Sequence, residues 1–98
     1  MIRRIVKLPI APGSENGAKF EALFQTYKKA IAAAEGCAEV QLLASHDCFF
    51  TFSLWQSEQA LNNYRHSEVF GEVWPQTKAL FSGAPEAWTC QLIERQSS

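Results

Sequence analysis

The sequence has no long apolar run, no strong charge of either sign and no paired cysteine motif. Nine Lys or Arg residues stand against ten Asp or Glu residues, which gives a formal net charge of −1. Domains that bind nucleic acid or anionic membranes usually carry clustered positive charge, so we expect neither partner. The amino-terminal segment MIRRIVKLPI alternates charged and apolar residues. It therefore predicts neither a signal peptide nor a membrane-spanning helix.

Cysteine and histidine are scattered rather than arranged in a metal-binding or disulfide pattern. The three cysteines, Cys37, Cys48 and Cys90, form no C-x-x-C pair, and the two histidines lie apart at positions 46 and 66. Free, buried thiols are typical of proteins in reducing compartments. The sequence thus predicts a cytoplasmic protein with no metal site and no cofactor-binding motif.

Apolar and aromatic residues are what the chain does have. They make up 47% and 12% of its 98 residues, which is typical of a globular protein. This length corresponds to one domain, and no linker divides it, so we expect a single domain over residues 1–98. A domain of this size has room for one core and a shallow ligand cavity.

Alternation and helical spacing divide the first half of the chain. Residues 3–10 alternate as in a strand, and turn residues 11–14 follow. A helix is predicted from an N-cap at Ser14 or Asn16 to Gly36, the residue just past its C-cap. Its apolar residues fall at three- and four-residue spacing along one face: Phe20, Leu23, Phe24, Tyr27, Ala30, Ile31 and Ala34.

The second half opens with a predicted hairpin and continues with helix. Residues 39–44 and 48–55 alternate as two strands around a turn at residues 45–47. Ser57 is expected to cap a helix over residues 57–66, and Ser67 to cap a second segment that reaches about Phe81. Pro75 is expected to kink or restart that segment. Residues 87–94 form the last predicted strand.

The predicted order is β-α-β-β-α-β, which is the ferredoxin-like α+β arrangement of a four-stranded antiparallel sheet. Both helical connections are expected on one side, so the other sheet face is uncovered. That face is predicted to show one of two residue sets, either Val6/Leu8/Val40/Leu42/Phe50/Phe52 or Leu43/Phe49/Trp55/Ile93. Both are too apolar to face water in a small monomer. We therefore expect a homodimer that buries sheet face against sheet face.

The segment Phe52–Ala60, FSLWQSEQA, resembles the W-x-S-x-x-A motif of the antibiotic biosynthesis monooxygenase family. The continuation Tyr64–Phe70, YRHSEVF, followed by Trp74, is also similar to members of that family. The resemblance covers roughly residues 3–94. It implies a dimeric α+β barrel with a small cavity between sheet and helices in each subunit. Many members of this superfamily oxygenate electron-rich aromatic compounds with O2, without a metal or a flavin.

The match to individual relatives is partial. Anthrone-oxidising relatives have an asparagine four residues before the tryptophan and a tyrosine six residues after it, whereas this chain has Thr51 and Leu61 around Trp55. Haem-degrading relatives have a tryptophan and, ten residues later, a haem-ligating histidine. Here those positions are Tyr64 and Trp74, and because an indole cannot replace the ligand, haem degradation is not expected.

The candidate site residues each have a structural interpretation beside the functional one. Trp55, Tyr64 and Trp74 are predicted to line a substrate cavity, although core packing explains large aromatics equally simply. His66 is the candidate proton acceptor because its ordinary pKa suits proton abstraction, and Arg65 or Asn62 is the candidate for holding the anion. A solvent-exposed position is the simpler explanation for these three. Thr51 completes the predicted substrate-binding set.

Three hypotheses follow for the function. The first is a cofactor-independent monooxygenase that acts on a small aromatic quinol or phenol. The second is a non-catalytic small-molecule-binding or stress-associated protein on the same scaffold, favoured by Thr51 and Leu61. The third is a structural dimer whose aromatic side chains fill their own cavity, and a ligand-sized void beside Trp55 and Trp74 would argue against it.

Overall fold

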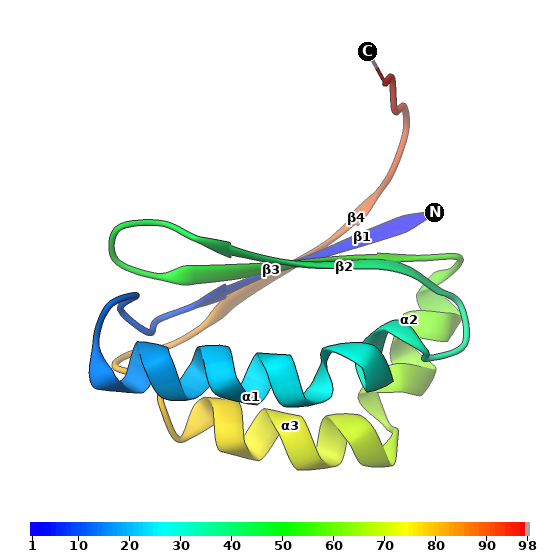
Figure 1. The fold of residues 1–98 in the computed structure, drawn as a ribbon. Coiled ribbons are helices and arrows are strands. Elements are labelled where there is room, and N and C mark those ends of the chain that lie inside the picture. Colours follow the sequence, from blue (N-terminus) through cyan, green and yellow to red (C-terminus); the bar gives the residue numbers. More distant parts are fainter. Residues whose placement is uncertain (98) are drawn as a thin grey trace.

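The computed structural model describes residues 1–97 and has a four-stranded antiparallel sheet with all three helices on one face (Figure 1). The strands lie in the order β2-β3-β1-β4. This arrangement confirms the predicted ferredoxin-like fold. The elements are β1 (Ile2–Leu8), α1 (Glu15–Ala32), β2 (Cys37–Ala44), β3 (Phe49–Trp55), α2 (Glu58–Arg65), α3 (Glu68–Lys78) and β4 (Glu86–Gln91).

Each helix begins at a serine whose side chain accepts a backbone hydrogen bond from the first turn. Ser14 Oγ accepts from Gly17 N at 2.9 Å, and Ser57 Oγ accepts from Ala60 N at 3.1 Å. The Ser67 hydroxyl caps α3 in the same way. An acidic residue also lies in the first turn of every helix, where it interacts favourably with the helix dipole. These caps confirm the predicted helix starts, with Ser14 rather than Asn16 at the first.

Two predicted helix features are wrong. The first helix ends at Ala32 instead of reaching the residue before Gly36, which lies in the following turn with φ of +83°. The alternative in which Pro75 restarts the helix is wrong, because α3 runs through it to Lys78. Pro75 lies on the exposed side, where water can reach the carbonyl that the proline leaves unbonded. The predicted break between residues 66 and 67 is confirmed, because His66 is the C-cap of α2 and Ser67 is the N-cap of α3.

The register of the sheet decides which side chains face the helices. On β1 and β3, Val6 pairs with Thr51 and Arg4 with Ser53, and this set faces the helices together with Val40 and Leu42 of β2. The opposite face carries another set: Ile5, Leu43, Phe50, Phe52, Leu54 and Trp88. Both predicted sets for the uncovered face are therefore wrong, since each mixes residues from the two sides.

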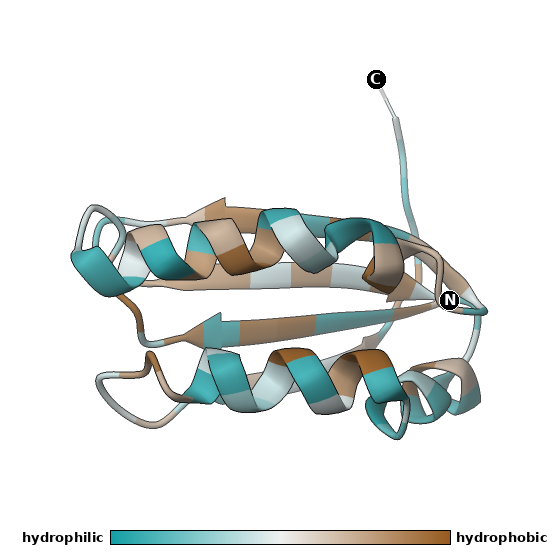
Figure 2. Ribbon diagram, turned by 60° about the horizontal axis from the view of Figure 1, so that its bottom comes forward, coloured by the Kyte–Doolittle hydropathy of each residue, from teal (hydrophilic) through white to brown (hydrophobic). Residues whose placement is uncertain are grey.

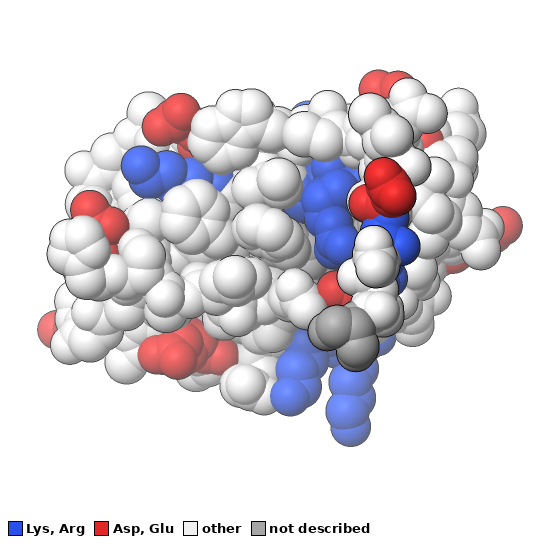
Figure 3. Space-filling model, turned by 90° about the horizontal axis from the view of Figure 1, so that it is seen from above, with Lys and Arg blue, Asp and Glu red and all other residues white. Residues whose placement is uncertain are grey.

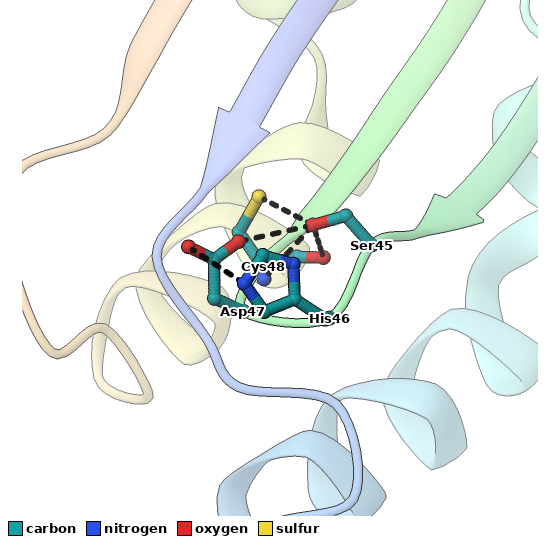
Figure 4. Close-up of polar contacts among 4 residues, drawn as sticks. All are labelled: Ser45, His46, Asp47 and Cys48. Carbon is teal, nitrogen blue, oxygen red and sulfur yellow. Dashed lines mark hydrogen bonds and ion pairs between the residues drawn. The ribbon is translucent and has the colours of Figure 1, made fainter.

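The turn between β2 and β3 brings four polar or reactive side chains together (Figure 4). Ser45 Oγ lies 3.1 Å from Asp47 Oδ1 and 3.2 Å from Cys48 Sγ. Its hydrogen bond and the nearby His46 lower the pKa of the Asp47 carboxyl. His46 is solvent-exposed, and Ser45 also bonds the backbone of Cys48, so this cluster closes the hairpin. Cys48 is buried, but Cys90 is exposed, against the prediction of a buried thiol.

The hydrophobic core lies between the sheet and α1. Its fully buried members are Leu8, Ile10, Phe20 and Phe49, and the rings of the last two pack with centroids 5.1 Å apart. Figure 2 shows hydrophobic and hydrophilic residues alternating along α1 and α3, as expected for helices with one face on a sheet. Over residues 1–97, none of the helices has the length and apolar character that crossing a membrane requires.

Candidate active-site cavity

A cavity of about 270 Å³ lies between the helix-facing side of the sheet and the three helices. All four strands and all three helices contribute to its wall. Its size is at the lower end of the range for small-molecule sites, so it suits a compact ligand of one or two rings. A void lined by both Trp55 and Trp74 argues against the third hypothesis, in which the protein's own side chains fill this space.

One wall of the cavity belongs to a continuous series of packed aromatic rings, which we call the aromatic ladder. Adjacent ring centroids are 5.1 to 5.7 Å apart, in stacked and edge-to-face pairs, through Trp55, Tyr64, Phe70, Trp74 and Phe81. Each such pair contributes about 0.5–1.5 kcal/mol beyond the burial of its area. The first four members of the ladder line the cavity. The ladder therefore lines the cavity with packed aromatic rings that an aromatic ligand could contact.

Trp55 and Tyr64 are fixed by their surroundings at the sheet end of the ladder. Trp55 is 1% exposed, and its indole Nε1–H donates to Ser53 Oγ at 2.9 Å. Its ring stacks on that of Tyr64 at an interplanar angle of 29°. Burial, with a smaller contribution from Cys37, raises the pKa of Tyr64 to about 12. Tyr64 is therefore a neutral phenol at physiological pH and can donate a hydrogen bond to an oxygen of a ligand.

The cavity also contains two arginines from distant parts of the chain. Arg4 comes from the middle of β1, and its Nη1 donates to Thr89 Oγ1 of β4 at 2.7 Å. Arg65 is the last residue of α2. Burial, and secondarily the positive charge of Arg65, lowers the pKa of Arg4. The two guanidinium groups are therefore close enough to repel each other within one cavity.

Among the predicted site residues, the cavity brings together Thr51, Trp55, Tyr64, Arg65 and Trp74. Tyr64 and Trp74 lie on different helices, and Phe70 bridges their rings. In the described part of the chain, neither of the other two residues contributes to the cavity wall. These are His66 and Asn62.

The predicted proton acceptor lies on the surface at the end of α2. His66 is exposed, and its Nδ1 lies 2.8 Å from the backbone oxygen of Asn62. This contact holds the ring against the outside of its own helix. His66 thus lies outside the cavity wall, whose charged residues are Arg4, Arg65 and Glu86.

Sequence reasoning missed Arg4, Ser53 and Thr77 as cavity residues. The sequence places Arg4 in a strand beside Ile5, but alternation alone does not say which of the two residues faces the helices. The strand register shows which face Arg4 is on, because Arg4 pairs with Ser53 and Thr89 on the side that the helices cover. Over residues 1–97, no group of three His, Cys, Asp or Glu side chains is arranged to hold a metal ion.

These features define a ferredoxin-like α+β protein with an aromatic, cationic ligand cavity under its sheet. The family model of antibiotic biosynthesis monooxygenases matches residues 1–74, and the chain belongs to this family. The resemblance that the W-x-S-x-x-A segment carried is thereby confirmed. A search of curated proteins finds no match to the sequence.

Solved structures repeat the fold over nearly the whole chain. A Caulobacter crescentus protein provisionally assigned as an antibiotic biosynthesis monooxygenase has 23% identity and a TM-score of 0.84, with 95% of this chain and 90% of that chain covered. A Bordetella bronchiseptica protein of the same provisional assignment has 24% identity and a TM-score of 0.79, covering 95% and 97%. Rv0793 from Mycobacterium tuberculosis has 18% identity and a TM-score of 0.85, covering 98% of each chain. At these identities the likeness concerns the fold.

Proposed function

We propose that this protein is a monooxygenase that oxidises a small aromatic quinol or phenol with O2, the substrate itself supplying the electrons. The observation that carries the proposal is the partly enclosed cavity, whose wall combines aromatic rings with two arginines. Membership of the antibiotic biosynthesis monooxygenase family supports it. The three free cysteines support the cytoplasm as its location.

In this proposal the protein promotes formation of the substrate anion. A ring bound against the aromatic ladder loses a proton to water at the cavity mouth, and the positive charges of Arg4 and Arg65 stabilise the anion. The anion transfers an electron to O2, and recombination of the two radicals forms a C–O bond on a ring carbon that keeps one hydrogen. The resulting peroxide anion takes up a proton from water and becomes a hydroperoxide. Loss of water then leaves a carbonyl, so that one oxygen atom enters the product and the other leaves as H2O. The neutral Tyr64 phenol donates a hydrogen bond to the substrate oxygen.

Oxygen uptake by the purified protein, measured against a panel of quinols and anthrones, tests this activity. We expect saturable uptake above the autoxidation rate, reduced at least about tenfold by Trp74→Leu, which removes a flat wall of the cavity. The matched control Trp88→Leu alters an exposed tryptophan on the other side of the sheet and keeps the activity. His66→Ala is expected to keep it as well, because His66 lies outside the cavity. No uptake across the panel would refute the proposal.

A non-catalytic binding protein is the second candidate, and the character of the cavity favours it. Leu61 is buried and lines the cavity at the position where anthrone-oxidising relatives have a tyrosine. Thr51 likewise replaces their asparagine. The wall therefore carries fewer polar groups than that mechanism uses. Panel compounds that bind to the cavity without any oxygen consumption would establish this alternative.

We further propose that two copies of the chain associate through their solvent-facing sheet surfaces. Ile5, Phe50 and Phe52 lie side by side on this surface by register, and Leu43 and Trp88 are 40% and 43% exposed. Figure 3 views the molecule from this side and shows mostly uncharged atoms, with a few basic and acidic residues among them. A patch of this kind is unusual on a small monomer. Its self-complementary apolar character favours a second copy as the occupant.

A further inference from the structure

The two arginines of the cavity have no negative partner within the described chain. No Asp or Glu carboxylate of residues 1–97 lies within 4.0 Å of either guanidinium group. Glu86 borders the cavity, but it pairs in register with Lys7, and that strand position alternates to the other sheet face. Two like charges thus share a partly enclosed apolar space without compensation.

An uncompensated pair of this kind costs stability in the unliganded protein. Arg4 is half-buried and lies among Val6, Leu8 and the aromatic ladder, where water solvates it less well than at the surface. The Thr89 hydroxyl accepts only one of its five N–H donors. The remaining donors are oriented by that contact and available to a ligand. Such an arrangement is explained if the ligand brings a negative charge of its own.

We propose that Arg4 and Arg65 bind the carboxylate of a compact aromatic acid whose ring lies against the aromatic ladder. A carboxylate matches the fork of a guanidinium group and can bridge two of them, whereas a neutral phenol offers one oxygen and no charge. A cavity of about 270 Å³ leaves space for one or two fused rings beside that carboxylate. That this acid is the substrate rests on the proposed function. That the two arginines bind it is independent of the proposed function.

Isothermal titration calorimetry with 2-naphthoate, its neutral methyl ester and 2-naphthyl phosphate tests the proposal on the whole chain. We expect naphthoate to bind on the order of tenfold to a hundredfold more tightly than the ester, which has the same rings. Equal affinities, or no measurable binding of naphthoate, would overturn the proposal. Tighter binding of the phosphate than of naphthoate would overturn the assignment to a carboxylate.

Three variants locate the effect. Arg4→Gln and Arg65→Gln should each remove about tenfold or more of the naphthoate affinity while leaving the ester affinity unchanged. Lys7→Gln removes the same charge from β1 on the opposite sheet face and should change neither. If Lys7→Gln causes the same loss, the effect comes from net charge and the proposal fails. Arg65 is exposed at a helix end, so its variant remains informative if Arg4→Gln does not fold.

Oxygen uptake separates this proposal from the proposed function. Selective binding of naphthoate, with no oxygen consumed on any hydroxylated aromatic acid or neutral quinol, would refute the monooxygenase and keep the carboxylate site. Equal turnover of neutral quinols and of their carboxylated counterparts, with equal Michaelis constants, would keep the monooxygenase and refute the carboxylate site.

Discussion

The helix-facing and solvent-facing sides of the sheet differ in a way that is unusual for a small domain. On the covered side, the central positions of β1 and β3 carry Arg4, Thr51 and Ser53, whereas the uncovered side carries Ile5, Phe50 and Phe52 at neighbouring positions. In a free-standing sheet the polar residues would face water and the apolar ones the helices. The proposed ligand cavity on the covered side and the proposed dimer on the uncovered side would together explain this reversal.

The largest effect is expected from a substitution that introduces a charge on the uncovered side of the sheet. Phe52→Asp would bury an unpaired carboxylate in the proposed dimer interface, which we expect to raise the dimer dissociation constant roughly a hundredfold or more. Sedimentation velocity over a range of micromolar concentrations measures this constant. Gln25→Asp adds the same charge on the exposed side of α1 and should leave the dimer intact. If the wild-type chain sediments as a monomer, the proposal that a second copy covers this side of the sheet fails.

Substitution of one tryptophan on each side of the sheet should change the free energy of unfolding by different amounts. Trp55→Ala should lower the free energy of unfolding by about 3–5 kcal/mol, because it empties a buried site at the sheet end of the ladder. Trp88→Ala, on the uncovered side, should change it by less than about 1 kcal/mol. Urea unfolding of both variants in the monomeric Phe52→Asp background measures folding apart from association. Equal losses would contradict the assignment of the two sides.

The buried phenol of Tyr64, on the covered side, makes the folding stability depend on pH. Because burial raises its folded-state pKa to about 12, above the ordinary value of 10.0, the folded protein retains the proton that the unfolded chain loses. Stability from this group is therefore complete below about pH 10 and falls as the pH rises toward 12. Urea midpoints across this range should fall for the wild type and for Tyr27→Phe. Tyr64→Phe should show a shallower fall, and an identical one would be evidence against a buried phenol.

The smallest expected effect concerns the ion pairs of the uncovered side. Glu39 forms ion pairs with Arg3, with Oε1 and Nη1 3.5 Å apart, and with Arg95, with Oε2 and Nη2 3.9 Å apart, and the Glu39 side chain is 26% exposed. Glu39→Gln should lower stability by about 1 kcal/mol or less, since partly solvated ion pairs contribute little. Chemical unfolding at low and high salt measures this loss, which salt should diminish. A loss that does not depend on salt would point to packing instead of charge.

The fold was largely predictable because its signals are local. Alternation located all four strands, and the serines at positions 14, 57 and 67 located the three helix starts. The end of α1 was not predictable from its own residues, since Ala33 and Ala34 are good helix formers. It is set by tertiary contacts, for the carbonyl of Gly36 accepts from Gln56 N at 2.8 Å and a side chain on Gly36 would collide with Ala60.

The site was predictable only in part because strand pairing builds it. Trp55, Tyr64 and Trp74 were found through their size and spacing, and each lines the cavity. Arg4 is 61 positions from Arg65 in the sequence, and only the register of β1 against β3 and β4 turns its side chain toward the helices. His66 has suitable chemistry, but the break between two helices leaves it exposed and outside the cavity wall. Residue type indicates what a side chain can do, and topology decides whether it is in position.

The placement of the tryptophans has a consequence for optical spectroscopy. The chain has three of them, and two, Trp55 and Trp74, lie rigidly in the cavity wall among other rings, whereas Trp88 is 43% exposed on the opposite side. Fixed, asymmetric ring pairs should give a strong near-ultraviolet circular dichroism signal that responds to a ligand. Iodide, which quenches exposed indoles, should act on Trp88, and the proposed dimer would reduce this quenching. The unlabelled protein thus carries separate optical reporters for the cavity and for the uncovered face.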